Sequence, residues 1–274
     1  MGKFWLGEKI DSEPLKSRNE IASEKHYVET THGDPLGRYI VWLPFRCNKF
    51  ELGESLFQAL NRFYALEKRF KVDQNFMVEY ERVTQENIDL NHMTLPDDTI
   101  GGYYLPYHAV MKLSSDITKL GVVFDASAKT FSEISLNDVL LVDSTIRNKI
   151  FEQVVRFQAH NYVITVDIAQ MYRQIIMHSD GRKYQRVLWY HDNQIRTYEL
   201  NAVTSSASST PFLAIRTIQQ LAYDESLDFP RASKILLRKL YADNLIFGAD
   251  TLDEIIHIRD EVIELWSQGE FSIR

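Results

Sequence analysis

The feature of this sequence that most constrains its fold is a strand-like run that ends in a carboxylate. The run Tyr162-Val163-Ile164-Thr165-Val166 is apolar on both faces, which predicts a strand at a central position in a sheet. Asp167 follows directly and would be held rigidly at the sheet edge. Such a carboxylate suits Mg²⁺, which takes hard oxygen ligands and commonly only one or two protein carboxylates. The alternative is that Asp167 only caps the turn that follows.

A second carboxylate lies in a predicted hairpin near the end of the sequence. The pattern predicts strands over 237–241 and 245–247, joined by a turn at Ala242-Asp243-Asn244. Asp and Asn are common in tight turns for conformational reasons, so this turn alone indicates no function. Two-metal phosphoryl transfer, however, needs carboxylates from two neighbouring strands. The occurrence of both carboxylates in one chain therefore favours a shared metal site.

A run of small residues lies between the two carboxylates. Ser205-Ser206-Ala207-Ser208-Ser209 precedes a predicted helix over 210–224, in which Pro211 is tolerated near the first turn. Small side chains would let a template base and an incoming nucleotide pack against the backbone. The alternative is a serine-rich loop that ends in a helix cap.

The remaining pattern predicts an α+β layer architecture, a class that hosts many functions. Residues 1–35 are polar and weakly patterned, which indicates an N-terminal arm. Helical periodicity predicts helices over 54–71 and 73–88, a third beginning at Ser144, and a fourth between Thr251 and Gly269. Strands are predicted over 40–43 and 121–124, a loop leading into an extended segment over 93–110, and a hairpin formed by 187–190 and 195–198.

Composition restricts the class of protein further. The 274 residues are enough for one large domain or two smaller ones, and 45% hydrophobic with 25% charged residues is typical of a globular chain. No apolar run approaches the roughly 20 residues of a membrane helix, and the N-terminus does not resemble a signal peptide. The single Cys47 excludes an internal disulfide and a cysteine-based zinc site. We expect an intracellular, cytoplasmic protein with no membrane partner.

Net charge is −7, which counts mildly against nucleic-acid binding because phosphates are held mainly by Lys and Arg. Basic groups at 68–71, 182–186 and 234–239 would be either solvated faces or parts of a basic groove.

Ordered motifs along most of the chain make it similar to a known family. The motifs are Leu105-Pro106-Tyr107-His108-Ala109-Val110, Val122-Val123-Phe124-Asp125-Ala126-Ser127-Ala128-Lys129, Ser135-Leu136-Asn137-Asp138-Val139-Leu140, Arg182-Lys183-Tyr184-Gln185-Arg186 and Ala249-Asp250-Thr251-Leu252. With these motifs the chain resembles the reverse-transcriptase domain of Pao/BEL-type LTR retrotransposons.

The resemblance implies a right-hand polymerase fold with fingers and palm subdomains only, the palm being an antiparallel sheet packed on helices. Residues 36–160 would form a fingers-like region with the start of the palm, and 161–274 the palm. Thumb, ribonuclease H, integrase and protease regions would be absent, which makes the chain a fragment of a retrotransposon polyprotein. Its partners would be an RNA or DNA template-primer and deoxynucleoside triphosphates.

The resemblance also implies roles for individual residues. Asp167 and Asp243 would hold two Mg²⁺ ions for nucleotidyl transfer onto a primer 3′-hydroxyl. Tyr172 would lie under the sugar and exclude ribonucleotides, and Lys119 would approach the triphosphate. Pro211 and the small residues before it would line the pocket for template and nucleotide.

Three positions depart from the family pattern. Asn244 stands where a second aspartate is usual, which removes a negative charge. Gly121 replaces an arginine that could clamp the triphosphate. Ser206 replaces a glycine, so its Cβ would clash at a position suited to close approach or to unusual backbone angles.

These departures leave three hypotheses. The chain is an active Mg²⁺-dependent polymerase, or an inactive relative with at most residual nucleic-acid binding, or an interaction module whose carboxylates only cap turns. The last would require Asp167 and Asp243 to lie more than about 10 Å apart, because two shared metal ions could not bridge that gap.

Overall fold

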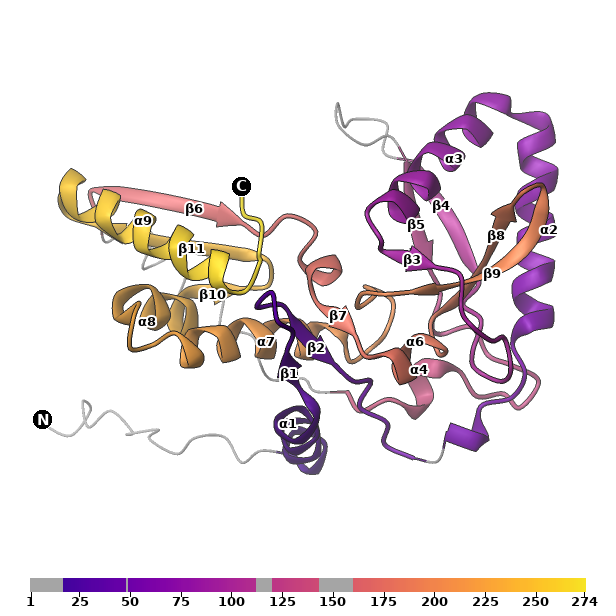
Figure 1. The fold of residues 1–274 in the computed structure, drawn as a ribbon, viewed down its shortest axis with the longest axis horizontal. Coiled ribbons are helices and arrows are strands. Elements are labelled where there is room, and N and C mark those ends of the chain that lie inside the picture. Colours follow the sequence, from indigo (N-terminus) through magenta and orange to yellow (C-terminus); the bar gives the residue numbers. More distant parts are fainter. Residues whose placement is uncertain (1–16, 48, 112–119, 143–159) are drawn as a thin grey trace, which may run out of the picture.

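The computed structural model describes residues 17–47, 49–111, 120–142 and 160–274. Figure 1 shows two groups of strands and helices joined through a smaller central sheet. One continuous buried core runs through all of these parts. Within the described ranges, none of the helices combines the length and the apolar character needed to cross a bilayer.

The first group is a three-stranded antiparallel sheet with helices packed on it. Its strand order is β10-β11-β6, and the helices α7, α8 and α9 pack against one another beside it (Figure 1). The bounds are β6 Tyr162–Asp167, β10 Leu240–Tyr241, β11 Asn244–Ala249, α7 Thr210–Asp224, α8 Pro230–Lys239 and α9 Leu252–Gln268.

The second group packs two long helices on two antiparallel hairpins. The helices α2 (Leu56–Val72) and α3 (Gln74–Asp89) carry apolar residues at helical spacing, as predicted. Their buried aromatic rings meet Trp189 of β8, which stacks on Tyr80 with ring centroids 5.3 Å apart. The strands are β3 Met93–Thr94, β4 Tyr107–Met111, β5 Leu120–Phe124, β8 Arg186–His191 and β9 Gln194–Leu200.

A small sheet and several short elements connect the two groups. Strand β2 pairs antiparallel with β1 and parallel with β7. The connecting elements are α1 Arg18–Thr30, β1 His32–Gly33, β2 Tyr39–Val41, η1 Lys49–Glu51, α4 Leu136–Val139, η2 Met171–Gln174, β7 Ile176–Met177 and α6 Ser179–Arg182.

Several predicted elements are confirmed. Helix α7 begins at Thr210 with Pro211 in its first turn, and the Thr251 hydroxyl accepts a hydrogen bond from the Glu254 backbone at the start of α9. The β8–β9 hairpin turns through Asp192 and Asn193, with φ of 49° and 60°, as a type I′ turn requires.

Other predictions were wrong. Residues 18–30 are a helix rather than an irregular arm, because Ser17 and Glu20 form a reciprocal capping box and Tyr27 is buried. Residues 237–239 extend α8 instead of the following strand. Strand β6 is not central, because among the described strands it pairs only with β11 and so lies at the edge of the sheet. The C-terminal segment meets only the end of β6. The helix expected after Ser144 lies outside the described residues.

Candidate active site

The two predicted metal-binding carboxylates lie at the same end of the β10-β11-β6 sheet, Asp167 at the end of β6 and Asp243 in the turn between β10 and β11. Asp167 ends β6, and its cross-strand partner is Asn244, the first residue of β11. The backbone N–H of Ile168 donates to the carbonyl oxygen of Asp243 over 2.9 Å. Strand pairing therefore fixes the two carboxylate-bearing residues beside each other, as the metal-site hypothesis requires and as the interaction-module hypothesis does not.

The backbone next to each carboxylate is held in a left-handed conformation. Ala242, one residue before Asp243, has φ 53°, and Gln170, three residues after Asp167, has φ 48° and ψ 43°. Residues with a Cβ seldom adopt this region, and where they do the surrounding structure must hold them there. The chain thus accepts local strain on both sides of the carboxylate pair.

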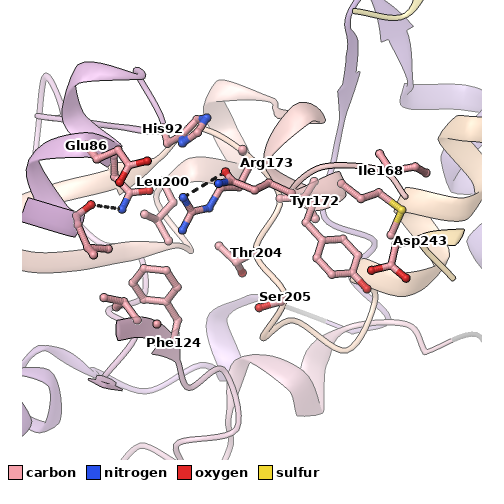
Figure 2. Close-up of a pocket in the computed structure, with 18 of the residues that line it drawn as sticks. Glu86, His92, Phe124, Ile168, Tyr172, Arg173, Leu200, Thr204, Ser205 and Asp243 are labelled. Carbon is pink, nitrogen blue, oxygen red and sulfur yellow. Dashed lines mark hydrogen bonds between the residues drawn. The ribbon is translucent and has the colours of Figure 1, made fainter. Parts of the chain in front are cut away.

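A cavity of about 370 Å³ opens onto this pair. Figure 2 shows Tyr172 and Asp243 at one end, Glu86 and His92 at the other, and Arg173 between them. Strand β5 lines the cavity with Gly121 among other residues. A Cβ built on Gly121 would meet only the Val110 carbonyl oxygen among the described residues, at 3.8 Å, so a Cβ fits there without a clash.

Each carboxylate of the pair already has a hydrogen-bond donor. The Arg274 Nε lies 2.5 Å from Asp167 Oδ2, and the two backbones exchange N–H···O bonds of 2.9 Å each. The Asn244 side-chain amide donates to Asp243 Oδ1 over 2.8 Å. The site therefore carries one cation and one amide against its two negative charges.

A second cation lies deeper in the cavity. Burial lowers the pKa of the Arg173 guanidinium, and the nearby Glu86 carboxylate opposes this effect. Burial also lowers the pKa of His92, and the positive charge of Arg173 acts in the same direction. Sequence reasoning missed Arg173, Arg274 and His92 as cavity residues. Of these three residues, the sequence could have indicated only Arg173, because it directly follows Tyr172.

The structure does not bring all the expected site residues together. Asp167, Asp243, Tyr172 and Gly121 line the cavity, whereas Asn244, Ser206 and Pro211 do not. Lys119 lies outside the described residues.

The expected backbone strain at Ser206 is absent. Ser206 has no positive φ, so its Cβ causes no unusual backbone angle, and that part of the expectation was wrong. Its carbonyl oxygen instead accepts a hydrogen bond of 3.2 Å from the Asn137 side chain.

The donor set limits which metal ion this site can hold. Among the described residues, no group of three or more His, Cys, Asp or Glu side chains is placed to bind a metal ion. Two carboxylates on one cavity wall suit Mg²⁺, because this ion usually combines one or two carboxylates with substrate phosphates and water. Asp167 would have to exchange its Arg274 contact for the metal ion.

Comparisons with known proteins agree with this geometry at the level of fold. No protein-family model and no curated protein matches the sequence. Among solved structures, the foamy viral protease-reverse transcriptase in complex with double-stranded DNA is similar at TM-score 0.55 and 12% identity, over 72% of this chain and 36% of that one. Prototype foamy virus protease-reverse transcriptase is similar at TM-score 0.52 and 14% identity, over 71% of this chain and 23% of that one.

The chain thus spans well under half the length of these neighbours. The described residues have a reverse-transcriptase-like α+β fold.

Proposed function

We propose that this chain is the fingers-and-palm part of a reverse transcriptase, an RNA-directed DNA polymerase of the Pao/BEL retrotransposon type. The observation that carries the proposal is the single cavity lined by Asp167, Asp243 and Tyr172. A carboxylate at the end of β6, a second in the adjacent β10–β11 turn and an aromatic side chain in the same cavity provide for metal binding and for packing against a sugar. The similarity to protease-reverse transcriptases supports the same conclusion.

In this proposal the sheet with β6, β10 and β11 is the palm, within residues 161–274. The β4–β5 pair with α2 and α3 belongs to the fingers-like region, within residues 36–160. The β8–β9 hairpin comes from the second part of the chain and packs against α2. The partners are a template-primer and deoxynucleoside triphosphates, and the neighbours' complexes with double-stranded DNA are consistent with that class of ligand. An intracellular location goes with this function.

The residues of the chain have separate roles in the proposed reaction. Asp167 and Asp243 would hold Mg²⁺, which when bound supplies charge stabilisation at the transferring phosphoryl group. Tyr172 would pack against the sugar of the incoming nucleotide and exclude a 2′-hydroxyl. Arg173 supplies positive charge inside the cavity, where its field acts on phosphate oxygens with little screening by water.

A second candidate function is nucleic-acid binding without catalysis. It is favoured by the hydrogen bond from the Asn244 amide to Asp243, which occupies a carboxylate oxygen that a metal ion would use. The ion pair between Arg274 and Asp167 acts in the same sense. Both contacts oppose metal binding, and neither changes the fold.

Template-directed incorporation of labelled nucleotides tests the proposal. The wild-type protein is compared in Mg²⁺ and in Mn²⁺ with Asp167→Asn and Asp243→Asn, and with Asp228→Asn as a control at an exposed aspartate far from the cavity. The polymerase function predicts incorporation that only the first two variants lose. Equal incorporation by wild type and Asp167→Asn would show that this cavity is not the catalytic site. Template binding without incorporation in either metal would support the second candidate.

A further inference from the structure

A second cavity adjoins the proposed active site on the far side of Arg173. Its volume is about 370 Å³, and it shares Arg173, His92 and Ala202 with the first cavity. Neither carboxylate of the active site lines it. We call it the arginine cavity, because Arg38, Arg173 and Arg182 all line it.

Besides the segment before β2 that carries Arg38, four segments distant in sequence converge on the arginine cavity. They are the end of α3 with the residues before β3, the η2–β7–α6 stretch, the backbone after β9, and the segment that follows α9. The Asn201 side chain donates to the Asn91 carbonyl oxygen over 2.9 Å and so joins two of these segments. Hydrogen bonds between distant segments make this a fixed feature of the fold.

Two of the three arginines form no ion pair with a described acidic side chain. Arg38 is paired with Asp34 over 3.1 Å. The Arg173 guanidinium donates to Gln170 Oε1 over 3.4 Å, and the Arg182 Nε donates to the Met177 carbonyl oxygen over 2.9 Å. A guanidinium withdrawn from water without a counter-ion is costly. Arg173 and Arg182 therefore lack a directly bound negative charge.

Nearby acidic groups do not supply that charge. Glu86 acts on Arg173 and Glu199 acts on Arg182 through space, but neither carboxylate lines the cavity. Glu270 does line it, and no ion pair joins this side chain to another described residue. Three guanidinium groups thus face one carboxylate, and the lining has a positive excess.

His92 also lines the arginine cavity. Its Nδ1 atom is buried and has no hydrogen-bond partner among the described residues. Solvent does not reach this nitrogen, so it takes no part in binding a ligand in the open space of the cavity. An anion there would accept hydrogen bonds from the Arg173 and Arg182 side chains.

We propose that the arginine cavity binds a small phosphate-bearing anion, such as inorganic triphosphate or the phosphate tail of a nucleotide. Arginine's planar group of donors matches phosphate oxygens in pairs, and two such groups face the same space. The volume lies at the low end for ligand pockets, which suits a small anion and excludes a duplex. The site is distinct from the metal-binding carboxylates, and its occupancy does not depend on the proposed polymerase activity.

Isothermal titration with inorganic triphosphate, in EDTA and without template, tests this site separately from catalysis. The wild-type protein should bind triphosphate, and Arg173→Gln and Arg182→Gln should each weaken binding at least about tenfold. Arg173→Gln removes only a 3.4 Å contact, so this variant should fold even if Arg182→Gln does not. Arg231→Gln changes the net charge equally at an exposed position and should bind as wild type does.

A competition experiment distinguishes the sources of the phosphate group. Inorganic phosphate and a nucleoside triphosphate should compete with inorganic triphosphate, whereas a short single-stranded DNA should not. The proposal is overturned if the wild type does not bind triphosphate, or if Arg173→Gln binds it as tightly as wild type. Displacement of triphosphate by the DNA would assign the cavity to a nucleic-acid backbone instead and would also overturn it.

Discussion

The Arg274 guanidinium lies on the carboxylate of Asp167, with Nε 2.5 Å from Oδ2. The two residues are also joined through their backbones, so the C-terminal segment continues the sheet beside the end of β6. A positive charge thus lies directly beside the carboxylate that the proposed function assigns to metal binding. We therefore expect Arg274 and a divalent cation to compete for the Asp167 carboxylate.

Replacing Arg274 by Gln should strengthen divalent-metal binding. The Arg274 side chain is 71% exposed, and exposed ion pairs contribute only about 0.2–1 kcal/mol. We therefore expect Mn²⁺ affinity to rise by no more than about fivefold, as measured by isothermal titration. Arg259→Gln, which removes a comparable exposed ion pair with Asp260, is the control. Unchanged affinity in Arg274→Gln would mean that the arginine does not compete with metal.

Replacing Asn244 by Asp should make stability depend on metal ions. The variant loses the 2.8 Å hydrogen bond to Asp243 and places two negative charges side by side. In EDTA the cost should be about 0.5–1 kcal/mol, a fall in Tm of about 1–4 °C. Mn²⁺ should raise the Tm of the variant more than that of wild type, because ligands stabilise the state that binds them.

Asn193→Asp is the matched control, because it makes the same change at the exposed tip of the β8–β9 hairpin. An equal response of both variants to Mn²⁺ would contradict a metal site at Asp243.

Truncating Tyr27 should destabilise the whole chain. Its ring is 1% exposed, its hydroxyl donates to Thr217 over 3.0 Å, and the Arg216 guanidinium lies over the ring. Burial also raises the Tyr27 pKa to about 12, so the phenol stays neutral. Tyr27→Ala should cost about 3 kcal/mol or more in urea unfolding. Ile21→Ala, at a 57% exposed position on the same helix, should cost less than about 1 kcal/mol.

Lowering the pH should weaken folding through His26. Burial lowers its pKa below the ordinary 6.5, partly offset by a hydrogen bond to Trp42. The unfolded chain therefore binds more protons below about pH 6.5, and stability falls as the pH drops from there towards the folded-state pKa. Urea unfolding at about pH 7 and about pH 5.5 should show a smaller loss in His26→Gln than in wild type. An identical loss of stability in His26→Gln and in wild type would mean that His26 does not cause the pH dependence.

Periodicity predicted the helices and hairpins whose residues alternate between core and solvent. The apolar spacing of α2 and the turn at Asp192-Asn193 are local signals, and the structure has both elements. Helix α1 was missed because its average hydropathy is low and, of its three buried residues, only Tyr27 is hydrophobic. The sequence predicts a solvated face or a basic groove for the group that contains Arg186, yet Arg186 is 2% exposed and bonded to Glu199 and to two backbone carbonyls. Its partners are distant in sequence, so no local pattern could indicate its burial.

The candidate site was predictable only in part, for the same physical reason. Asp167 ends a strand and Asp243 lies in a hairpin turn, and both positions are visible in the local sequence pattern. Arg274 and His92 reach the site through tertiary packing, which spacing does not encode. The unstrained backbone at Ser206 likewise depends on its loop, where Asn137 bonds its carbonyl oxygen.

In the proposed function, the cavity at Asp167 and Asp243 is a metal-dependent site for nucleotidyl transfer. Template-directed primer extension in Mg²⁺ tests it most directly, with wild type, Asn244→Asp and the double variant Asp167→Asn/Asn244→Asp in parallel. The Asn244→Asp variant should extend the primer at least about tenfold faster than wild type does, a gain of about 1.4 kcal/mol in transition-state stabilisation. The double variant should not extend the primer. If Asn244→Asp does not extend the primer, or if all three proteins extend it equally, the cavity is not a metal-dependent site for nucleotidyl transfer.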